Sequence, residues 1–506
     1  MYENGKIYMG LAGDKRVELA LNMCNRHGLI AGASGTGKTV TMKVMAESFS
    51  DAGVPVFLCD VKGDVAGICA PGQSSEGMEK RIDKFGLRDR FVYQGYPTTF
   101  WDVYQEGGHA VRATVSDMGP ELLSRILGLT AVQEGILHIV FQIADDKGLL
   151  LIDLKDLRAM LTYVSEHRAE YMMTYGNITP QSVAAILRAL LPLEQQGGEL
   201  FFGEPALDIR DWMRTAADGR GMINVLDCVK LVQNPTLYAS FLLWMLSELF
   251  EILPEAGDLD KPRMVFFFDE AHMLFRDAPA VLLQKVEQTV KLIRSRGVGV
   301  YFVTQSPSDI PDTVLAQLSS RVQHALRAYT PAELKAVRAA ARAFRPNPAF
   351  QAEDAIMELG VGEALTSFLD EAGVPPVVER TKIICPQSLM SVPEPMVRAK
   401  VMMHDGMEKY DEFVDNVSAY EVLTAEREEA ETAKQEEADR KAREKEEAQA
   451  EKLRLKEEEA ERKRKQKLED EARRKAERRA AKIESQLISA GGQVLKRGLL
   501  GVLKKW

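Results

Sequence analysis

The segment "LIAGASGTGKTVTM" (29–42) decides the fold of this chain. Seven of its fourteen residues are Gly, Ser or Thr, and they lie between an apolar run and an expected helix. Residues 32–39, "GASGTGKT", match the P-loop pattern at every fixed position. Glycines let successive backbone N–H groups approach phosphates, and a helix beginning near Lys38 directs its positive end at them. The segment therefore predicts a strand, a phosphate-binding loop and a helix.

The same loop predicts the residues of a nucleotide site. We expect Lys38 to bind the β- and γ-phosphates of ATP and the Thr39 hydroxyl to bind Mg²⁺. ATP and Mg²⁺ are thus the expected cofactors. The predicted nucleotide-binding residues are Gly32, Ala33, Ser34, Gly35, Thr36, Gly37, Lys38, Thr39 and Val40.

A second candidate segment is "MVFFFDEAH" (264–272), in which five apolar residues favour a buried parallel strand. Asp269 follows at the carboxyl end of that strand, where ligands gather in open α/β sheets. We expect Asp269 to coordinate Mg²⁺ and Glu270 to orient and deprotonate the attacking water. The alternative is that this acidic pair only begins a helix.

Two further strands end in polar residues. Gln305 follows "GVGVYFVT" (297–304) and is predicted to contact the γ-phosphate or the water, as a third catalytic residue beside Lys38 and Glu270; the alternative is a solvated loop glutamine. Asp60 ends the strand in "VFLCDVKGD" (56–64), with Lys62 and Asp64 beside it. It either reaches the outer shell of the metal or a substrate, or it caps the turn, and the sequence does not decide between these roles.

Arginines matter because ring ATPases complete each site with a guanidinium from the neighbouring subunit. The candidates for this role flank the last two strands of the core. Each one alone is better explained as a surface residue, but we expect one of the four to serve if the protein is a ring. The four are Arg294, Arg296, Arg321 and Arg327. His27 and His272 are assigned structural roles, and Cys59 is assigned to core packing.

The order of patterns predicts an α/β fold with a mainly parallel sheet. Residues 27–70 form one β-α-β unit, whose helix is expected to end at Ser50 to Gly53. Residues 116–217 have helical apolar spacing, with a helix start at Thr179-Pro180, and form a large helical insertion. The α/β pattern then resumes with a helix at 236–252, a helix at 278–296, a strand in "SSRVQHALRAY" (319–329), a capping box at "TPAE" (330–333) and a hairpin turning at Asp370 to Gly373.

Residues 424–482 consist almost entirely of Glu, Lys, Arg, Ala and Gln, with acidic residues concentrated early and basic ones late. Pairs such as Glu458–Arg462 have the favourable i,i+4 spacing, whereas Leu453, Leu455 and Leu468 are too few for a sustained coiled-coil seam. We favour a long solvated single helix over a weak coiled coil. The last residues, 483–506, form an amphipathic basic tail that either docks on a partner or membrane surface or frays.

The expected division of the chain is therefore in five parts. Residues 1–115 are the first part of the ATPase core, 116–217 the helical insertion, and 218–400 the second part of the core. Residues 401–482 are a linker and the charged helix, and 483–506 are the tail.

The composition limits the cell compartment and the partners. Five dispersed cysteines without a CxxC pair indicate reduced thiols and argue against a disulfide framework or a zinc site. The first ten residues lack the pattern of a secretory signal, and the apolar segment 237–253 contains Glu248 and Glu251. We therefore expect no transmembrane segment and a cytoplasmic protein. The net charge of −10 requires any nucleic-acid contact to come from a local basic surface.

The tetrapeptide "DEAH" (269–272) suggests a superfamily-two helicase, but the acidic box lies too far from the P-loop and no second RecA-like domain follows. The set "RHGLIAGASGTGKT", "LCDVKGD", "FFFDEAH", "GVGVYFVTQSPSDIP" and "GEALTSFLDE" instead resembles the HerA–FtsK superfamily of P-loop ATPases. Within it, the chain is most similar to bacterial HerA-like proteins of the YjgR type. The resemblance covers roughly residues 10–385.

This resemblance implies a RecA-like core, a hexameric ring and ATP-driven translocation of double-stranded DNA. By motif match it assigns phosphate binding to Lys38 and Thr39, metal coordination to Asp269, catalysis to Glu270 and sensing to Gln305. The chain departs from the family in its acidic net charge and in the short segment before the P-loop, from which we expect the N-terminal barrel of HerA to be absent.

Three functions are compatible with the sequence. The first is an oligomeric ATPase motor that acts on DNA. The second is a nucleotide-gated scaffold or protein-remodelling ATPase that binds a protein partner through the charged helix. The third, a small-molecule kinase, is disfavoured because no acceptor site is evident.

Overall fold

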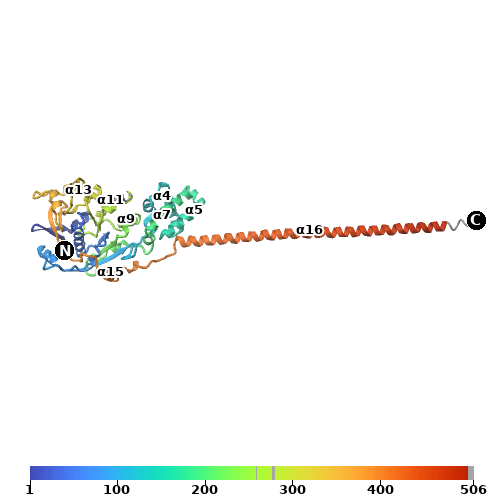
Figure 1. Cartoon of the computed structure of the whole chain (residues 1–506), viewed down its shortest axis with the longest axis horizontal. Helices are drawn as coiled ribbons and strands as arrows, with labels where there is room; N and C mark the ends of the chain where they lie inside the picture. Colours follow the sequence, from blue (N-terminus) through green and yellow to red (C-terminus); the bar gives the residue numbers. More distant parts are fainter. Residues whose placement is uncertain (258, 276–279, 500–506) are drawn as a thin grey trace, which may run out of the picture. The chain divides into compact units, whose positions relative to one another are not determined.

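The computed structural model describes residues 1–257, 259–275 and 280–499, with side chains described up to residue 489 (Figure 1). Contacts divide the chain into two compact units, one ending at Leu423 and the other beginning at Thr424. The first unit holds the sheet and nearly all of the helices. The second holds most of the charged helix.

Within the described residues, thirteen strands form one sheet in the order β1-β2-β13-β12-β11-β4-β10-β9-β5-β8-β6-β7, with β3 paired to β2. The strands from β11 to β7 are parallel to one another, and the remaining pairs are antiparallel. The strand bounds are β1 Tyr2–Glu3, β2 Lys6–Ala12, β3 Lys15–Ala20, β4 Gly28–Ala31, β5 Val56–Asp60, β6 Thr98–Asp102, β7 His109–Ala110, β8 Ile223–Asp227, β9 Met264–Phe268, β10 Val298–Thr304, β11 Ser320–His324, β12 Glu363–Ser367 and β13 Glu379–Ile383.

The predicted β-α-β unit is present. The P-loop follows β4, helix α1 (Lys38–Asp51) comes next, and β5 lies parallel to the central strands. Gly53 has a φ of +69°, and its N–H donates to the Ser50 carbonyl, so the helix ends at the glycine as expected. The mainly parallel α/β fold predicted from the sequence is confirmed.

Residues between β7 and β8 form mostly helices, as the apolar spacing predicted. Thr114, Thr130 and Asp153 begin α3, α4 and α5 with capping boxes, and the Thr179 hydroxyl accepts from the Ser182 N–H at the start of α7. The helix bounds up to β8 are α1 Lys38–Asp51, α2 Glu76–Lys84, α3 Val115–Ile126, α4 Ala131–Lys147, α5 Leu154–Glu166, α6 Arg168–Tyr175, α7 Pro180–Gln195 and α8 Gly198–Phe201.

The second half of the core follows the predicted order with two differences. The strand expected over 319–329 is only β11, because after His324 the Ala325 carbonyl turns to accept from the P-loop Ala33 N–H. The helix expected over 278–296 is described as α11 followed by a 3₁₀ turn at Ile293–Arg296, and residues 278–279 lie outside the described residues. The remaining helices are α9 Pro235–Ile252, α10 His272–Phe275, α11 Ala280–Leu292, α12 Asp312–Leu315, α13 Pro331–Arg342, α14 Ala352–Glu358, α15 Pro395–Met402 and α16 Ala419–Leu499.

The terminal hairpin and its neighbouring helix also agree with the sequence. Thr330 begins α13 with a capping box. Strands β12 and β13 pair antiparallel, and the Gly373 N–H donates to the Asp370 carbonyl at the predicted turn. The two strands are shorter than the hairpin segment, since residues 368–378 form a loop between them.

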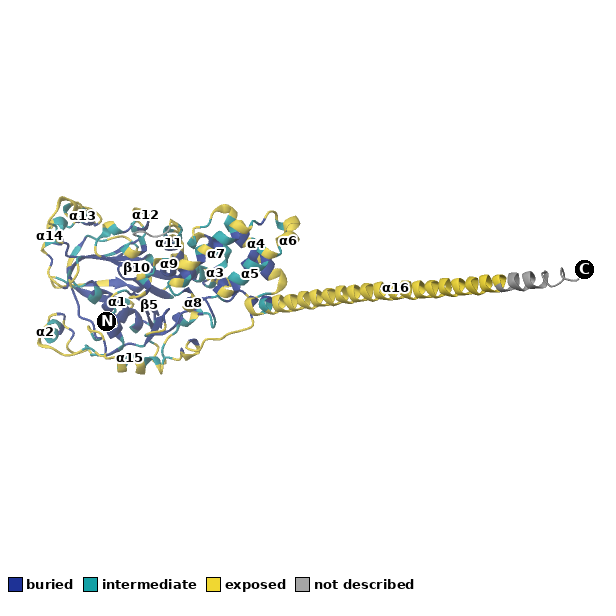
Figure 2. Cartoon of the chain, turned by 45° about the vertical axis from the view of Figure 1, so that its right-hand side comes forward, coloured by how far each residue is buried: buried dark blue, intermediate teal, exposed yellow. Residues whose placement is uncertain are grey.

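The strands of the sheet are largely buried (Figure 2), and apolar residues pack on both of its faces. Successive strand residues point to opposite faces, so Phe266 and Phe268 pack with α9, α11 and the helical insertion, whereas Val265 and Phe267 pack with α1 and the N-terminal strands. A sheet covered on both faces exposes functional groups at the ends of its strands. The site is therefore expected at the carboxyl edge of β4, β10, β9 and β5.

Helix α16 is one continuous helix whose described side chains from Glu426 to Ser489 are exposed (Figure 2). Ion pairs at i,i+4 spacing connect, for example, Lys441 with Glu437 and Arg473 with Glu477. The predicted long C-terminal helix is confirmed, whereas the choice between a single helix and a coiled coil, and the role of the tail, stay predictions. Among the described residues, no helix has the length and apolarity needed to cross a membrane.

Candidate active site

The P-loop connects β4 to α1, and its glycines are required by close neighbours. A Cβ on Gly32 would lie 2.5 Å from the His324 Cβ. A Cβ on Gly37, whose φ is +114°, would lie 3.3 Å from the Gly362 N. Gly35, with a φ of +75°, has open space around it, so its backbone conformation alone favours glycine. The loop is thus fixed between α1 and the ends of β11 and β12.

Lys38 is the first residue of α1 and is buried. Its Nζ donates to the Gly32 carbonyl at 2.7 Å and to the Ala33 carbonyl at 3.2 Å, so the lysine spans the loop. Burial lowers the pKa of Lys38, and the nearby Glu270 carboxylate acts in the opposite direction. Thr39 and Val40 follow in the same turn and are half-buried, whereas Ser34 and Gly35 are exposed.

Asp269 lies directly after β9, two strands from the P-loop in the sheet order. Its Oδ1 accepts from the Glu270 N–H at 2.9 Å, and its Oδ2 is buried without a hydrogen-bond partner. Burial raises the pKa of Asp269 to about 7. A buried carboxylate oxygen without a partner is destabilising on its own, so it indicates a ligand.

These groups fit Mg²⁺. Magnesium is commonly held by one or two protein oxygens, with phosphates and waters completing the octahedron. Asp269 Oδ2 and the Thr39 hydroxyl are of that kind. Among the described residues, no group of three or more His, Cys, Asp or Glu side chains forms a site for a metal held by protein alone, and the proposed site does not require one.

Glu270 is buried and has the left-handed φ of +46°. Its Oε1 forms an ion pair with Lys62 Nζ, and its Oε2 accepts from Gln305 Nε2 at 3.3 Å. His272 Nδ1 lies 3.1 Å from the same Oε2. Burial alone raises the pKa of Glu270, but the hydrogen bond and charge of Lys62 outweigh it and hold the pKa below its ordinary value.

The structure brings together most of the residues chosen from the sequence. Asp269 and Glu270 follow β9, and Gln305 follows the adjacent β10, which pairs with the P-loop strand β4. Asp60 is the last residue of β5, but its two oxygens accept from the Gly63 and Val65 N–H groups at 2.7 and 3.1 Å. The geometry of Asp60 is thus that of a turn cap.

The four candidate arginines differ in what they contact. Arg321 donates to the carbonyls of Leu318, Ala343 and Leu315, and Arg327 to those of Met357 and Leu359. Arg296 donates to the Leu253 carbonyl. Arg294 is exposed and makes no hydrogen bond to the described residues through its guanidinium.

Sequence reasoning did not place three residues in this site, and it assigned one of them, His272, a structural role only. Lys62 and His272 contact Glu270, and His324 lies under the P-loop. His324 Nε2 lies 2.8 Å from the Thr41 hydroxyl, and its Nδ1 lies 2.9 Å from the Glu363 carbonyl. Burial lowers the pKa of His324 to about 4, so the ring is neutral at pH 7; Nδ1 donates to the carbonyl and Nε2 accepts from the threonine. Of these three residues, only Lys62 could have been found from the local sequence, because it lies in "DVKGD" directly after a predicted strand.

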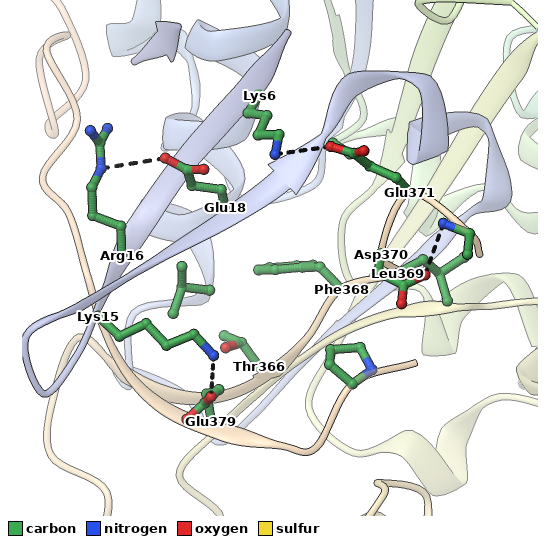
Figure 3. A pocket seen from close by; sticks show the side chains of 14 residues that line it. Lys6, Lys15, Arg16, Glu18, Thr366, Phe368, Leu369, Asp370, Glu371 and Glu379 are labelled. Atoms are coloured by element: carbon green, nitrogen blue, oxygen red, sulfur yellow. Dashed lines mark hydrogen bonds and ion pairs between the residues drawn. The ribbon is translucent and has the colours of Figure 1, made fainter. Parts of the chain in front are cut away.

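A separate surface pocket of about 540 Å³ lies between β3 and the loop after β12 (Figure 3). Ion pairs on its rim connect Lys6 with Glu371 at 3.1 Å and Lys15 with Glu379 at 2.7 Å. Because these rim charges neutralise one another, the pocket has no evident preference for an anionic ligand. It contains none of the residues of the P-loop site.

Comparison with known protein families shows the family of this chain. Residues 8–506 match the model of the family described as "Helicase HerA-like C-terminal", which confirms the resemblance drawn from the motifs. Comparison with curated proteins finds no match.

Solved structures show the same fold. The plasmid coupling protein TrwB in complex with the GTP analogue GDPNP is 14% identical, with a TM-score of 0.50, and the match covers 77% of this chain and 93% of TrwB. TrwB in complex with the ATP analogue ADPNP is 13% identical with a TM-score of 0.50, over 78% of this chain and 93% of TrwB. VirB4 of Thermoanaerobacter pseudethanolicus is 17% identical with a TM-score of 0.48, over 78% of this chain and 99% of VirB4. At these identities the TrwB structures support the fold alone.

Proposed function

Because the chain belongs to the Helicase HerA-like C-terminal family, we propose that it is an ATP-hydrolysing motor that works as an oligomeric ring on double-stranded DNA. The observation that best supports hydrolysis is the partnerless, buried Oδ2 of Asp269, placed beside Glu270 and Gln305 at the carboxyl edge of the P-loop sheet. The complexes of TrwB with GDPNP and ADPNP support nucleotide binding by a protein of this fold.

The residues of the site have distinct roles in this proposal. Backbone N–H groups of residues 34–39 bind the phosphates, and Lys38 exchanges its carbonyl partners for phosphate oxygens, a better match for its charge. Thr39 and Asp269 hold Mg²⁺, which neutralises charge that develops on the phosphates. Glu270 accepts a proton from the attacking water, and Gln305 donates a hydrogen bond to the water or the γ-phosphate.

An oligomer would supply the remaining positive charge. A guanidinium from a neighbouring subunit stabilises the transition state in many P-loop ATPases. Of the four candidates, Arg294 is the one we propose for this role, because Arg296, Arg321 and Arg327 are hydrogen-bonded to backbone carbonyls of their own subunit.

The test is steady-state ATP hydrolysis with and without double-stranded DNA, at low and moderate salt, with Glu270→Gln as the inactive reference. We expect DNA to raise a rate that the variant lacks. The stimulation should fall steeply as salt increases, since phosphate contacts release counterions. Hydrolysis that does not respond to DNA at either salt concentration would refute the DNA part of the proposal and leave the ATPase part intact.

A second candidate function is favoured by α16. Its side chains are exposed over more than sixty residues, from Glu426 to Ser489, so it is available to a protein partner. In this alternative the ATPase gates a scaffold or remodels a protein, and DNA is not the substrate. Deleting residues 424–506 should then abolish recovery of the partner and leave basal hydrolysis unchanged, and undiminished recovery would exclude it.

A further inference from the structure

Both carboxylate oxygens of Glu270 are in contact with other side chains. Oε1 forms the ion pair with Lys62, and Oε2 contacts Gln305 and His272. The Glu270 side chain is only 5% exposed. A general base must hydrogen-bond the water that it activates. One of these contacts therefore has to open before hydrolysis.

The contact most able to open is the one with Lys62. Its side chain is 43% exposed, so water can solvate the ammonium group as it leaves. The lysine stem has four rotatable bonds, and Nζ can move while the backbone stays fixed. That backbone is held by Asp60, which accepts from Gly63 and Val65 on either side of the turn. Lys62 thus has a mobile charged end on an anchored loop.

The Lys62 contact is also the strongest of the three. It joins two full charges, and the Glu270 carboxylate in it is buried, whereas Gln305 is neutral and its hydrogen bond is 3.3 Å long. Loss of the Lys62 contact would therefore increase the mobility of the Glu270 side chain more than loss of the Gln305 contact would.

The sheet order shows from which side Lys62 reaches the site. The strands run β4, β10, β9, β5, so the P-loop and Lys62 follow strands on opposite sides of Glu270. At a strand spacing of about 4.8 Å, the ends of β4 and β5 are roughly 14 Å apart. An anion that approaches the exposed end of Lys62 from the β5 side can draw it away without passing through the P-loop.

We propose that Lys62 is a restraining residue, which holds Glu270 in an ion pair until the phosphate backbone of a nucleic acid competes for its ammonium group. This inference rests on the proposed function and adds a means by which the substrate would switch hydrolysis on. Lys62 is a positioning residue here, since it acts through Glu270 and does not touch the nucleotide.

The experiment uses the full chain with Lys62→Met, Lys62→Arg and a matched control, Lys230→Met. Lys230 forms an ion pair with Glu106 that is likewise partly exposed, on another turn. The initial rate of ATP hydrolysis is measured over a range of ATP concentrations, with and without a defined DNA duplex. Thermal unfolding is recorded for each variant, and Lys62→Gln replaces Lys62→Met if the latter does not fold.

The expected result is a change in kcat without a change in the KM for ATP. Lys62→Met should raise the DNA-free kcat towards the DNA-stimulated value of the unchanged chain, with the KM for ATP unaltered, so that the stimulation ratio falls to about one. Lys62→Arg should restore most of the restraint because it keeps the charge. Lys230→Met should behave like the unchanged chain.

Other outcomes overturn the inference. A kcat for Lys62→Met that is unchanged, or that falls towards that of Glu270→Gln, would show that Lys62 does not restrain the base. If DNA does not stimulate the unchanged chain, the DNA part of the proposed function fails, and the restraint is then decided by the DNA-free kcat alone. If neither the unchanged chain nor Lys62→Met hydrolyses ATP, the ATPase proposal and the restraint both fail.

Discussion

The turns after β5 and β9 begin with the same residue type on neighbouring parallel strands, yet they leave that residue in different situations. Asp60 has both oxygens satisfied by the Gly63 and Val65 N–H groups of its own turn. Asp269 has one oxygen satisfied, by the Glu270 N–H, and one buried oxygen without a partner. The first is a turn cap, and the second is suited to bind a cation.

The difference comes from where the following N–H groups point. After β5, Gly63 adopts a φ of +76° and the chain turns back over Asp60. After β9, the Ala271 N–H donates to the Val303 carbonyl of β10, and the Met273 N–H donates to the Glu270 carbonyl. Those donors are not available to Asp269. An aspartate at the end of a parallel strand can thus bind a ligand only when the N–H groups of its own turn donate to other acceptors.

Two more strands of the sheet end in aspartate and resemble β5. Asp102 accepts three N–H groups of its turn, and Asp227 accepts the Val229 N–H and lies 3.6 Å from an Arg398 nitrogen. Of these four strand-end aspartates, Asp269 alone has an orphan oxygen among the described residues.

The largest expected effect is on the rate of ATP hydrolysis, when aspartate is replaced by asparagine at the ends of two different strands. Asp269→Asn should lower the rate of ATP hydrolysis by a factor of about one hundred or more, because it removes the anionic ligand of Mg²⁺. Asp227→Asn, at the end of β8, should hydrolyse ATP at a rate close to that of the unchanged chain. The measurement is the initial rate at saturating ATP and Mg²⁺. Equal losses in both variants would show that the two turns do not differ in function.

Local sequence was sufficient to predict that the candidate residues within single motifs lie close together at one edge of the sheet. The P-loop, the Asp269-Glu270 pair and Gln305 each follow a recognisable apolar strand, and the parallel sheet brings the three strand ends together. The helical insertion was equally accessible, since apolar spacing and N-cap residues act over a few positions.

Contacts between distant segments were not accessible in this way. His324 lies 283 positions from Thr41, and no feature of "SSRVQHALRAY" indicates a ring nitrogen under the P-loop. The restraint on Glu270 depends on a lysine from another strand end. Strand β6 was also not predicted, since its residues Thr98–Asp102 contain no apolar run like those of β5 and β9 and its partner β8 is far along the chain.

The second prediction concerns pH and Asp60. Burial raises the pKa of Asp60 from its ordinary 3.8 to about 6, despite the two N–H groups that favour the ionised form. The folded chain then holds a proton that the unfolded chain releases between about pH 4 and pH 6. The free energy of unfolding should therefore fall by up to about 3 kcal/mol as the pH rises through this range, through this group alone.

Asp60→Asn isolates that contribution. Its free energy of unfolding, relative to the unchanged chain, should rise between about pH 4 and pH 6 and stay constant above. Denaturant unfolding of both proteins at each pH gives the difference, in which the titration of other groups cancels. A difference that does not change with pH would show that the turn hydrogen bonds fully offset the burial of the charge.

The smallest expected effect is a difference in the free energy of unfolding between two alanine variants, Asp102→Ala and Asp269→Ala. Asp102→Ala leaves the Tyr104, Glu106 and Gly107 N–H groups without their acceptor and should lower the free energy of unfolding by about 1–2 kcal/mol. Asp269→Ala should lower it less, because it removes a buried oxygen that had no partner. Denaturant unfolding in the absence of nucleotide and Mg²⁺ makes the comparison. A larger loss for Asp269→Ala than for Asp102→Ala would mean that Asp269 stabilises the fold, and the distinction between the two kinds of turn would fail.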